Sequence, residues 1–159
     1  VIATHSDQAL EMLSDPSDDE RDILGSILYQ PNLAILHTDT SILPDHKNAW
    51  ASWNYHIPKA DLEGVAVTYN MNMLQSLDAP ETFCVTLNRP ELIDPSKIIT
   101  KIWYDHPVYN VQSLKRQQQH HKINGVNRTY FAGAYWGYGF HEDGVNSALA
   151  VTKHFGKTI

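Results

Sequence analysis

The segment that most limits the fold runs from Thr129 to Val151, "TYFAGAYWGYGFHEDGVNSALAV". Its first four residues are typical of the end of a buried strand. Apolar residues then recur at helical spacing, at Val145, Ala148, Leu149, Thr152 and Phe155. Three glycines and four aromatic residues lie between, namely Gly133, Gly137, Gly139, Tyr135, Trp136, Tyr138 and Phe140. The sequence therefore predicts a strand, a glycine-rich loop and the start of a helix.

The opening of the chain, "VIATHSDQAL", is an extended apolar run that passes into a helical pattern at Ser6. Ser17 followed by Glu20 predicts a capping box. The apolar stripe of that second helix consists of Ile23, Leu24, Ile27 and Leu28. We expect two short helices after an opening strand.

Five extended segments follow, separated by turn residues: "LAILHTD", "AWASWNYH", "VAVTYNMN", "FCVTLNR" and "KIITKIWYDH". In residues 65–72 apolar and polar side chains alternate, which is typical of a strand covered on one side. An antiparallel sheet is the simplest interpretation. Residues 113–122 are nearly all polar and favour helix, so we expect an exposed helix that leads back to the glycine-rich loop.

The order of these elements is nested: a strand at the start and a strand and helix at the end enclose a block of helices and antiparallel strands. If the first strand and the strand near Tyr130 share a layer, the chain from Leu10 to roughly Lys122 forms an inserted subdomain. The predicted fold class is α+β.

Composition excludes several functions. Twelve Lys and Arg against 18 Asp and Glu give a net charge of −6 with no dense basic run, which argues against nucleic acid as a partner. No apolar stretch approaches the roughly 18 residues of a membrane span. The single cysteine, Cys84, is expected to be a small buried side chain and favours the cytoplasm. The nine histidines accompany neither an HExxH motif nor cysteine pairs, so no metal site is predicted.

The ends of the chain resemble the flavin-containing amine oxidase superfamily. "YFAGAYWGYGFHEDGVNSALAV" is similar to its carboxy-terminal flavin motif, and "VIATHSDQAL" resembles the segment that leaves the FAD domain. "LHTD", "AWASWNYH" and "GFHEDG" resemble a bacterial subgroup described as predicted NAD/FAD-binding oxidoreductases.

The resemblance implies a domain plan. Residues 1–10 would be an FAD-domain strand, residues 11–122 a substrate domain of helices and about five antiparallel strands, and residues 123–159 the closing FAD-domain strand and helix. The Gly-x-Gly-x-x-Gly fingerprint that holds a dinucleotide is absent from these 159 residues. We therefore expect the carboxy-terminal portion of an FAD-dependent oxidoreductase, with a missing amino-terminal FAD-binding segment of the same protein as its partner. Alone, the chain should bind FAD poorly.

In such a protein a substrate C–H bond is oxidised by hydride transfer to the flavin. The substrate would be a small molecule, either an amine or lipid-like. No residue stands out as an obligatory base, and His141, beside the helix start, is as suited to capping or packing as to catalysis.

The resemblance also places a cofactor site at the glycine-rich loop. The expected cofactor-binding residues are Ala3, Thr4, Gly133, Ala134, Tyr135, Asp143, Gly144 and Val145. Backbone amides at Gly144 and Val145, at a helix N-terminus, would stabilise negative charge on a reduced flavin. The side chains of Glu142 and Asp143 should cap the helix or point away.

The expected substrate-lining residues are Trp136, Tyr138, Phe140, Trp53 and Tyr55, although plain packing explains these aromatic residues as well. A different class of function also fits the sequence: a self-contained α+β ligand-binding or interaction domain without a redox role.

Overall fold

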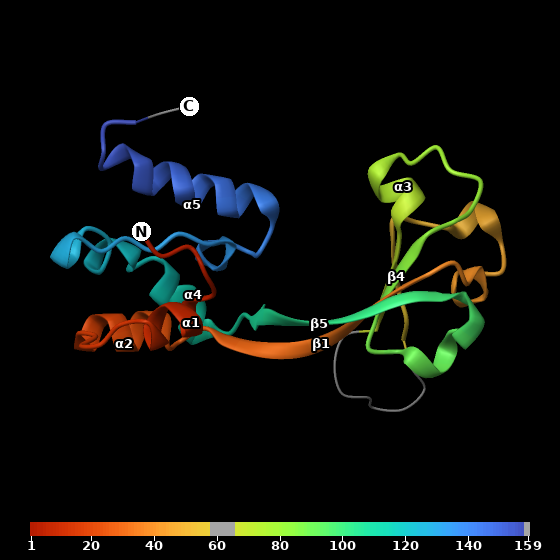
Figure 1. Cartoon of the computed structure of the whole chain (residues 1–159), viewed down its shortest axis with the longest axis horizontal. Coiled ribbons are helices and arrows are strands. Elements are labelled where there is room, and N and C mark those ends of the chain that lie inside the picture. The colour runs from red at the N-terminus through yellow and green to blue at the C-terminus, as the bar shows by residue number, and fades with distance from the viewer. Residues whose placement is uncertain (58–65, 158–159) are drawn as a thin grey trace. The chain divides into compact units, whose positions relative to one another are not determined.

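The computed structural model describes residues 1–57 and 66–157 and confirms the α+β class. The chain forms two compact units (Figure 1). The terminal unit comprises Val1–Gln30 and Pro107–Ile159, and the sheet unit comprises Pro31–His106. This division differs from the expected insertion at 11–122, because residues 11–30 and 107–122 group with the chain ends. Val65 and the expected turn at 58–64 lie outside the described residues.

Among the described residues there are five strands, one in each of the five predicted segments; they form one sheet that lies mainly in the sheet unit, and its two longest strands extend into the terminal unit. Their order is β2-β3-β4-β1-β5. Their bounds are β1 Leu28–His37, β2 Trp53–Tyr55, β3 Val67–Asn70, β4 Cys84–Leu87 and β5 Ile98–Val108. The pairs β2–β3, β3–β4 and β1–β4 are antiparallel. The strand predicted for residues 65–72 ends early, because Asn70 caps the short helix α3 (Met71–Gln75) by accepting from the amide of Met73 at 3.2 Å.

The more buried face of this sheet is polar. The register aligns Asn54, Thr68 and Thr86 across three strands, and all three are buried. Ile35 pairs with Thr86 and packs against Ile42 and Ile93. The opposite face carries Trp53, Tyr55, Tyr69, Val85 and Leu36. Cover is not confined to one side as expected, because Val67 and Leu87 on this second face are buried too, but the fully buried side chains lie on the polar face.

Cys84 is fully buried in β4, as expected. Burial raises the pKa of its thiol to about 11, so the side chain behaves as a small neutral group.

The terminal unit packs short helices around one apolar cluster. Its helices are α1 Ser6–Glu11, α2 Asp18–Leu24, α4 Val111–Gln117 and α5 His141–Lys153. The predicted capping box of α2 is confirmed, since Ser17 Oγ accepts from the Glu20 amide at 3.3 Å and the Glu20 carboxylate accepts from the Ser17 amide at 2.8 Å. The cluster consists of Ala9, Ile23, Leu24, Ile27, Ile123, Phe131 and Tyr135. Leu28, expected in the stripe, is 59% exposed because α2 ends at Leu24.

The two ends of the chain meet in the terminal unit. Ile2 and Phe131 form a parallel bridge, in which the Ile2 amide donates to Tyr130 O at 2.8 Å and the Ala132 amide donates to Ile2 O at 3.0 Å. The opening segment and the segment before the glycine-rich loop therefore lie side by side, although each contributes a single bridge residue and not the strand that the sequence predicted. None of the described helices is long and apolar enough to cross a bilayer.

Candidate functional site

The glycine-rich loop, residues 133–140, joins the Ile2–Phe131 bridge to α5. It begins with a 3-10 turn, Ala134–Trp136. The amides of Gly137 and Gly139 both donate to Ala134 O, at 3.0 and 3.2 Å, so the loop folds back on itself. Gly139 has φ +86°, a conformation that favours glycine. A Cβ on Gly133 would lie 2.3 Å from the Tyr135 ring. Glycine is needed here for close approach and for turning.

Helix α5 begins at His141, earlier than its apolar spacing predicts. The amide of Gly144 already donates to Phe140 O at 3.2 Å, and Val145 lies further along the helix. The expectation that the amides of Gly144 and Val145 face a cofactor is therefore wrong in register. Among the described residues no acceptor bonds to the amides of residues 141–143. These three amides are the ones that could meet an anion.

The Asp143 carboxylate clamps the loop onto α5. Its Oδ2 accepts from the amides of Tyr138 and Phe140, both at 3.0 Å. This confirms the expected capping role. A carboxylate in the first turn is also favoured by the helix dipole. Asp143 therefore uses its side chain to hold its own loop.

A second clamp comes from α4. The buried Gln117 donates through Nε2 to Tyr135 O and to Gly137 O, both at 2.7 Å. The sequence predicted an exposed polar helix over residues 113–122, but Ser113 and Gln117 are buried. Gln117 lies under the loop whose carbonyls it bonds, and Ser113 is bonded to Asn110 at the start of α4. Sequence reasoning missed Gln117, and a polar residue in a polar helix gives no signal that could reveal it.

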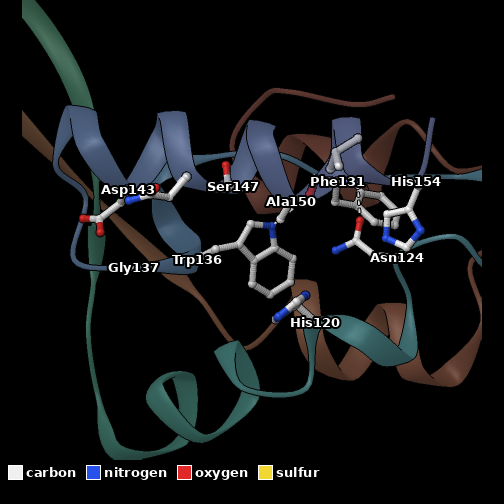
Figure 2. Close-up of a pocket in the computed structure, with 11 residues that line it drawn as sticks. His120, Asn124, Phe131, Trp136, Gly137, Asp143, Ser147, Ala150 and His154 are labelled. Atoms are coloured by element: carbon white, nitrogen blue, oxygen red, sulfur yellow. Dashed lines mark hydrogen bonds between the residues drawn. The ribbon is translucent and has the colours of Figure 1, made fainter. Parts of the chain in front are cut away.

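Figure 2 shows a pocket of about 220 Å³ beside α5. Trp136 and His120 form one side, with their rings 5.8 Å apart. Phe131, Ala150 and Val151 supply apolar walls. The pocket also takes in Asn124, Asn146, Ser147, His154, Gly137 and Asp143.

Side chains of the pocket satisfy the backbone of Phe131. Asn124 Oδ1 accepts from the Phe131 amide at 2.7 Å, and Trp136 Nε1 donates to the Phe131 carbonyl at 3.0 Å. Ser147 Oγ accepts from the Gly133 amide at 2.9 Å and donates to Gly144 O at 2.9 Å. The pocket wall, the bridge and the loop are thus one hydrogen-bonded unit.

The structure brings together only part of the expected site. Gly133, Ala134, Tyr135, Asp143, Gly144 and Val145 all lie in the loop or the start of α5. Ala3 and Thr4 directly follow the bridge residue Ile2, and Thr4 Oγ1 donates to His5 O. Tyr135 is 4% exposed and belongs to the apolar cluster, so its ring packs within the unit.

The aromatic residues divide between the two units. Trp136 lines the pocket, whereas Tyr138 and Phe140 are 70% and 57% exposed. Trp53 and Tyr55 are in β2, and the Trp53 ring meets the Tyr69 ring edge-on at 5.1 Å. A substrate site shared by the two groups stays a prediction.

Tyr109 is a further residue that the sequence did not indicate. Its hydroxyl lies beneath the loop, 3.0 Å from the position of a Cβ on Gly139. Among the described residues the buried hydroxyls of Tyr109 and Tyr135 have no hydrogen-bond partner. Burial raises the pKa of Tyr109 to about 12, so this phenol is neutral at ordinary pH.

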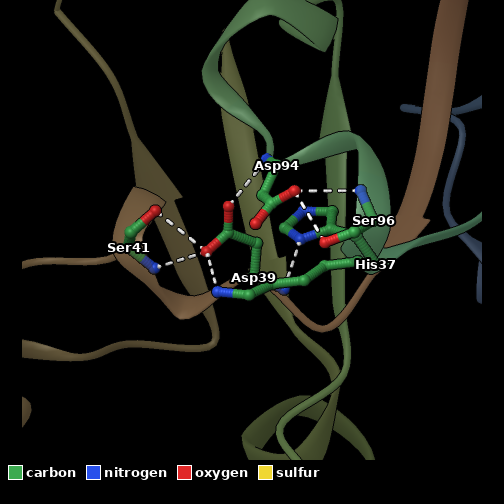
Figure 3. Close-up of polar contacts among 6 residues, drawn as sticks. His37, Asp39, Ser41, Asp94 and Ser96 are labelled. Carbon is green, nitrogen blue, oxygen red and sulfur yellow. Dashed lines mark hydrogen bonds and ion pairs between the residues drawn. The ribbon is translucent and has the colours of Figure 1, made fainter.

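The sheet unit contains its own acidic centre, Asp39 (Figure 3). The carboxylate is 2% exposed and accepts from the Asp94 amide at 2.8 Å, the Ser41 amide at 3.1 Å and the Ser41 hydroxyl at 2.9 Å. Lys97 Nζ lies 3.1 Å away. Burial alone would raise the pKa of Asp39, but these donors outweigh it and hold the pKa well below its usual range. Asp39 joins two loops and is not a free acid or base.

Comparison of the chain with models of known protein families and with curated proteins finds no match. Within the described residues no three His, Cys, Asp or Glu side chains are grouped so that they could hold a metal ion.

Replacing Gln117 with Leu should loosen the loop. Two buried carbonyls would lose their donor, which should lower the free energy of unfolding by about 2–3 kcal/mol. Amide exchange at Gly137 and Gly139 should quicken. The neighbouring exposed residue supplies the control, and Gln118→Leu should change neither quantity. Equal effects of the two variants would contradict the clamp.

A methyl group at Gly137 should break the clamp formed by the Asp143 carboxylate. Its Cβ would lie 2.3 Å from Asp143 Oδ1, so Gly137→Ala should displace the carboxylate and destabilise the protein by about 1–3 kcal/mol. At Gly144 the nearest atom would be 3.9 Å away, so Gly144→Ala should stabilise α5 by about 0.5–1 kcal/mol. Urea unfolding of both variants measures this difference in sign.

Asp39→Asn should destabilise the sheet unit by about 2–3 kcal/mol, because donors that now face a carboxylate would face an amide NH₂. The pKa of Asp39 is lower in the folded protein than its ordinary 3.8, so its contribution is fully present above that pH and is lost as pH falls from there through the lower pKa of the folded state. The unfolding free energy of the variant should therefore vary less with pH in acid. An acid transition identical to that of the unmodified protein would refute this role.

Proposed function

We propose that this chain is the carboxy-terminal portion of an FAD-dependent oxidoreductase similar to the flavin-containing amine oxidases. The observation that carries the proposal is the parallel bridge between Ile2 and Phe131. It joins two distant segments beside a glycine-rich loop and a helix N-terminus, as the resemblance implies. FAD, when bound, would accept a hydride from a substrate C–H bond.

The first turn of α5 suits the anionic edge of a reduced flavin. The amides of residues 141–143 have no acceptor among the described residues, and they lie at the positive end of a 13-residue helix. Gln117 and Asp143 hold the preceding loop from two sides. Donors fixed in this way need no reorganisation when negative charge develops next to them.

The surface of α5 supports a partner segment. The helix packs through Ser147 and Val151, which are buried, whereas Val145 is 47% exposed. Ala148, on the same predicted stripe, is exposed as well. In the proposed protein the amino-terminal FAD-binding segment covers this stripe and supplies the dinucleotide fingerprint. A cytoplasmic location and a small amine or lipid-like substrate belong to the same proposal.

A second candidate is a ligand-binding domain without redox chemistry. The pocket of about 220 Å³ favours it, because residues of the terminal unit alone form this pocket and satisfy the backbone beneath it. Such a domain would take a small ligand with an apolar body.

The first experiment uses the protein together with any coding sequence that precedes this chain in its gene. The purified protein should show the visible absorption of oxidised flavin, and an oxidisable substrate should bleach it without oxygen. A folded, colourless product that takes up no FAD would favour the binding domain.

His141→Pro tests the role of the helix amides directly. Proline is tolerated at the first position of a helix, and Phe140 already has the extended φ −81° and ψ 160° that a residue before proline prefers. The substitution removes one amide hydrogen and leaves the helix intact. We expect a lower flavin reduction potential than in His141→Ala, which keeps the amide. Equal potentials in the two variants would contradict the assignment of these amides.

A further inference from the structure

Four side chains form a continuous hydrogen-bonded relay on the covered face of the sheet. His37 Nε2 lies 2.8 Å from Thr86 Oγ1, Thr86 Oγ1 lies 2.8 Å from Thr68 Oγ1, and Thr68 Oγ1 lies 3.0 Å from His56 Nε2. The relay crosses β1, β4 and β3 and ends just beyond β2. His37, Thr68 and Thr86 are fully buried, and His56 is partly exposed.

The direction of every bond in this relay follows from one amide. The Asp39 amide donates to His37 Nδ1 at 3.1 Å, so that nitrogen carries no proton. A neutral His37 therefore carries its proton on Nε2 and donates to Thr86. The Thr86 hydroxyl proton has no other acceptor among the described residues, so Thr86 donates to Thr68, and Thr68 then donates to His56 Nε2. His56 is consequently neutral, with its proton on Nδ1.

A proton count shows why the relay resists acid. It has three contacts and, with both imidazoles neutral, three protons to place on them. A proton taken up at His56 Nε2 would be the fourth, so a buried hydroxyl would lose its acceptor. His37 has no free nitrogen either, because Nδ1 already accepts from Asp39.

The surroundings of His56 also oppose its protonation. Burial and the charge of Arg89 lower the pKa of His56. Burial lowers the pKa of His37 against the charge of Asp39. Asp39 is itself bound by Lys97 and by the Asp94 amide, and Cys84, the cross-strand neighbour of His37, stays neutral. Both histidines thus favour the neutral form.

We propose that this relay is a pH-sensitive latch for β2: protonation of His56 breaks its bond from Thr68 and releases β2 from β3. β2 is a three-residue strand at one edge of the sheet, and the bond from the His56 amide to Ala66 O, at 2.8 Å, continues the same ladder. Trp53 and Tyr55 belong to this strand, so its release would rearrange the aromatic face in mild acid. The latch does not depend on flavin binding.

Nitrogen NMR of the histidine rings tests the relay first. At neutral pH His37 should carry its proton on Nε2 and His56 on Nδ1, and the opposite tautomers would overturn the proposal. As pH falls from about 7 to about 5, His56 should titrate below the ordinary histidine value of about 6.5, because burial and the charge of Arg89 lower its pKa. The amides of Trp53–Tyr55 should lose exchange protection with the same midpoint, while those of Cys84–Leu87 stay protected.

Variants separate the latch from plain packing. Thr68→Val removes the donor to His56 and should raise its titration midpoint towards the ordinary value, whereas Thr68→Ser should keep it low. The exposed Thr100→Val in β5 is the matched control and should change nothing. If Thr68→Val does not fold, His56→Gln gives an independent test, because it cannot take up a proton and should keep β2 protected in mild acid. The proposal fails if β2 still opens at the same pH in His56→Gln, or if Thr68→Val leaves the His56 midpoint unchanged.

Discussion

The pairing of Ile2 with Phe131 is the contact on which the terminal unit depends. Phe131 is 1% exposed and belongs to the apolar cluster, while its neighbours Tyr130 and Ala132 exchange backbone hydrogen bonds with Ile2. The polar groups of Phe131 itself are satisfied by Asn124 and Trp136. A buried strand residue whose amide and carbonyl are both satisfied is held firmly, and the glycine-rich loop starts two residues later. The position of the α5 N-terminus follows from that anchor.

In the sheet unit the more buried face of the sheet consists largely of hydrogen-bonding side chains. Burying hydroxyl, amide and imidazole groups is costly only when their partners are lost. Here Thr68 and Thr86 are bonded to each other and to histidines, and Asp39 has several donors. Alternation in the sequence predicted a strand with one covered side, yet Val67 on the second face of β3 is buried as well. Periodicity shows which side chains share a face, and does not show which faces become covered or whether polar groups find partners.

The sequence predicted the elements of the candidate site but not all of its contacts. Glycines followed by helical spacing indicated a loop and a helix, and both are present. The start of α5 was misplaced because residues 141–144 carry no apolar periodicity, although an acid at the third helical position, Asp143, is itself a capping signal. The role of Gln117 could not be predicted from the sequence, for a different reason. Its burial depends on loop carbonyls that approach from a distant part of the chain.

The exposed apolar side chains of α5 bear on both proposed functions. Single exposed apolar residues are ordinary on protein surfaces, whereas a row at helical spacing is typical of a face that packs against something. Val145 and Ala148 are exposed on α5, and Phe155 lies beyond the end of the helix, where its ring packs against Tyr130. These exposed side chains fit a covering segment in the proposed flavoprotein and also fit the surface of an isolated domain. The pairing of Ile2 with Phe131 therefore carries more of the distinction than this helix does.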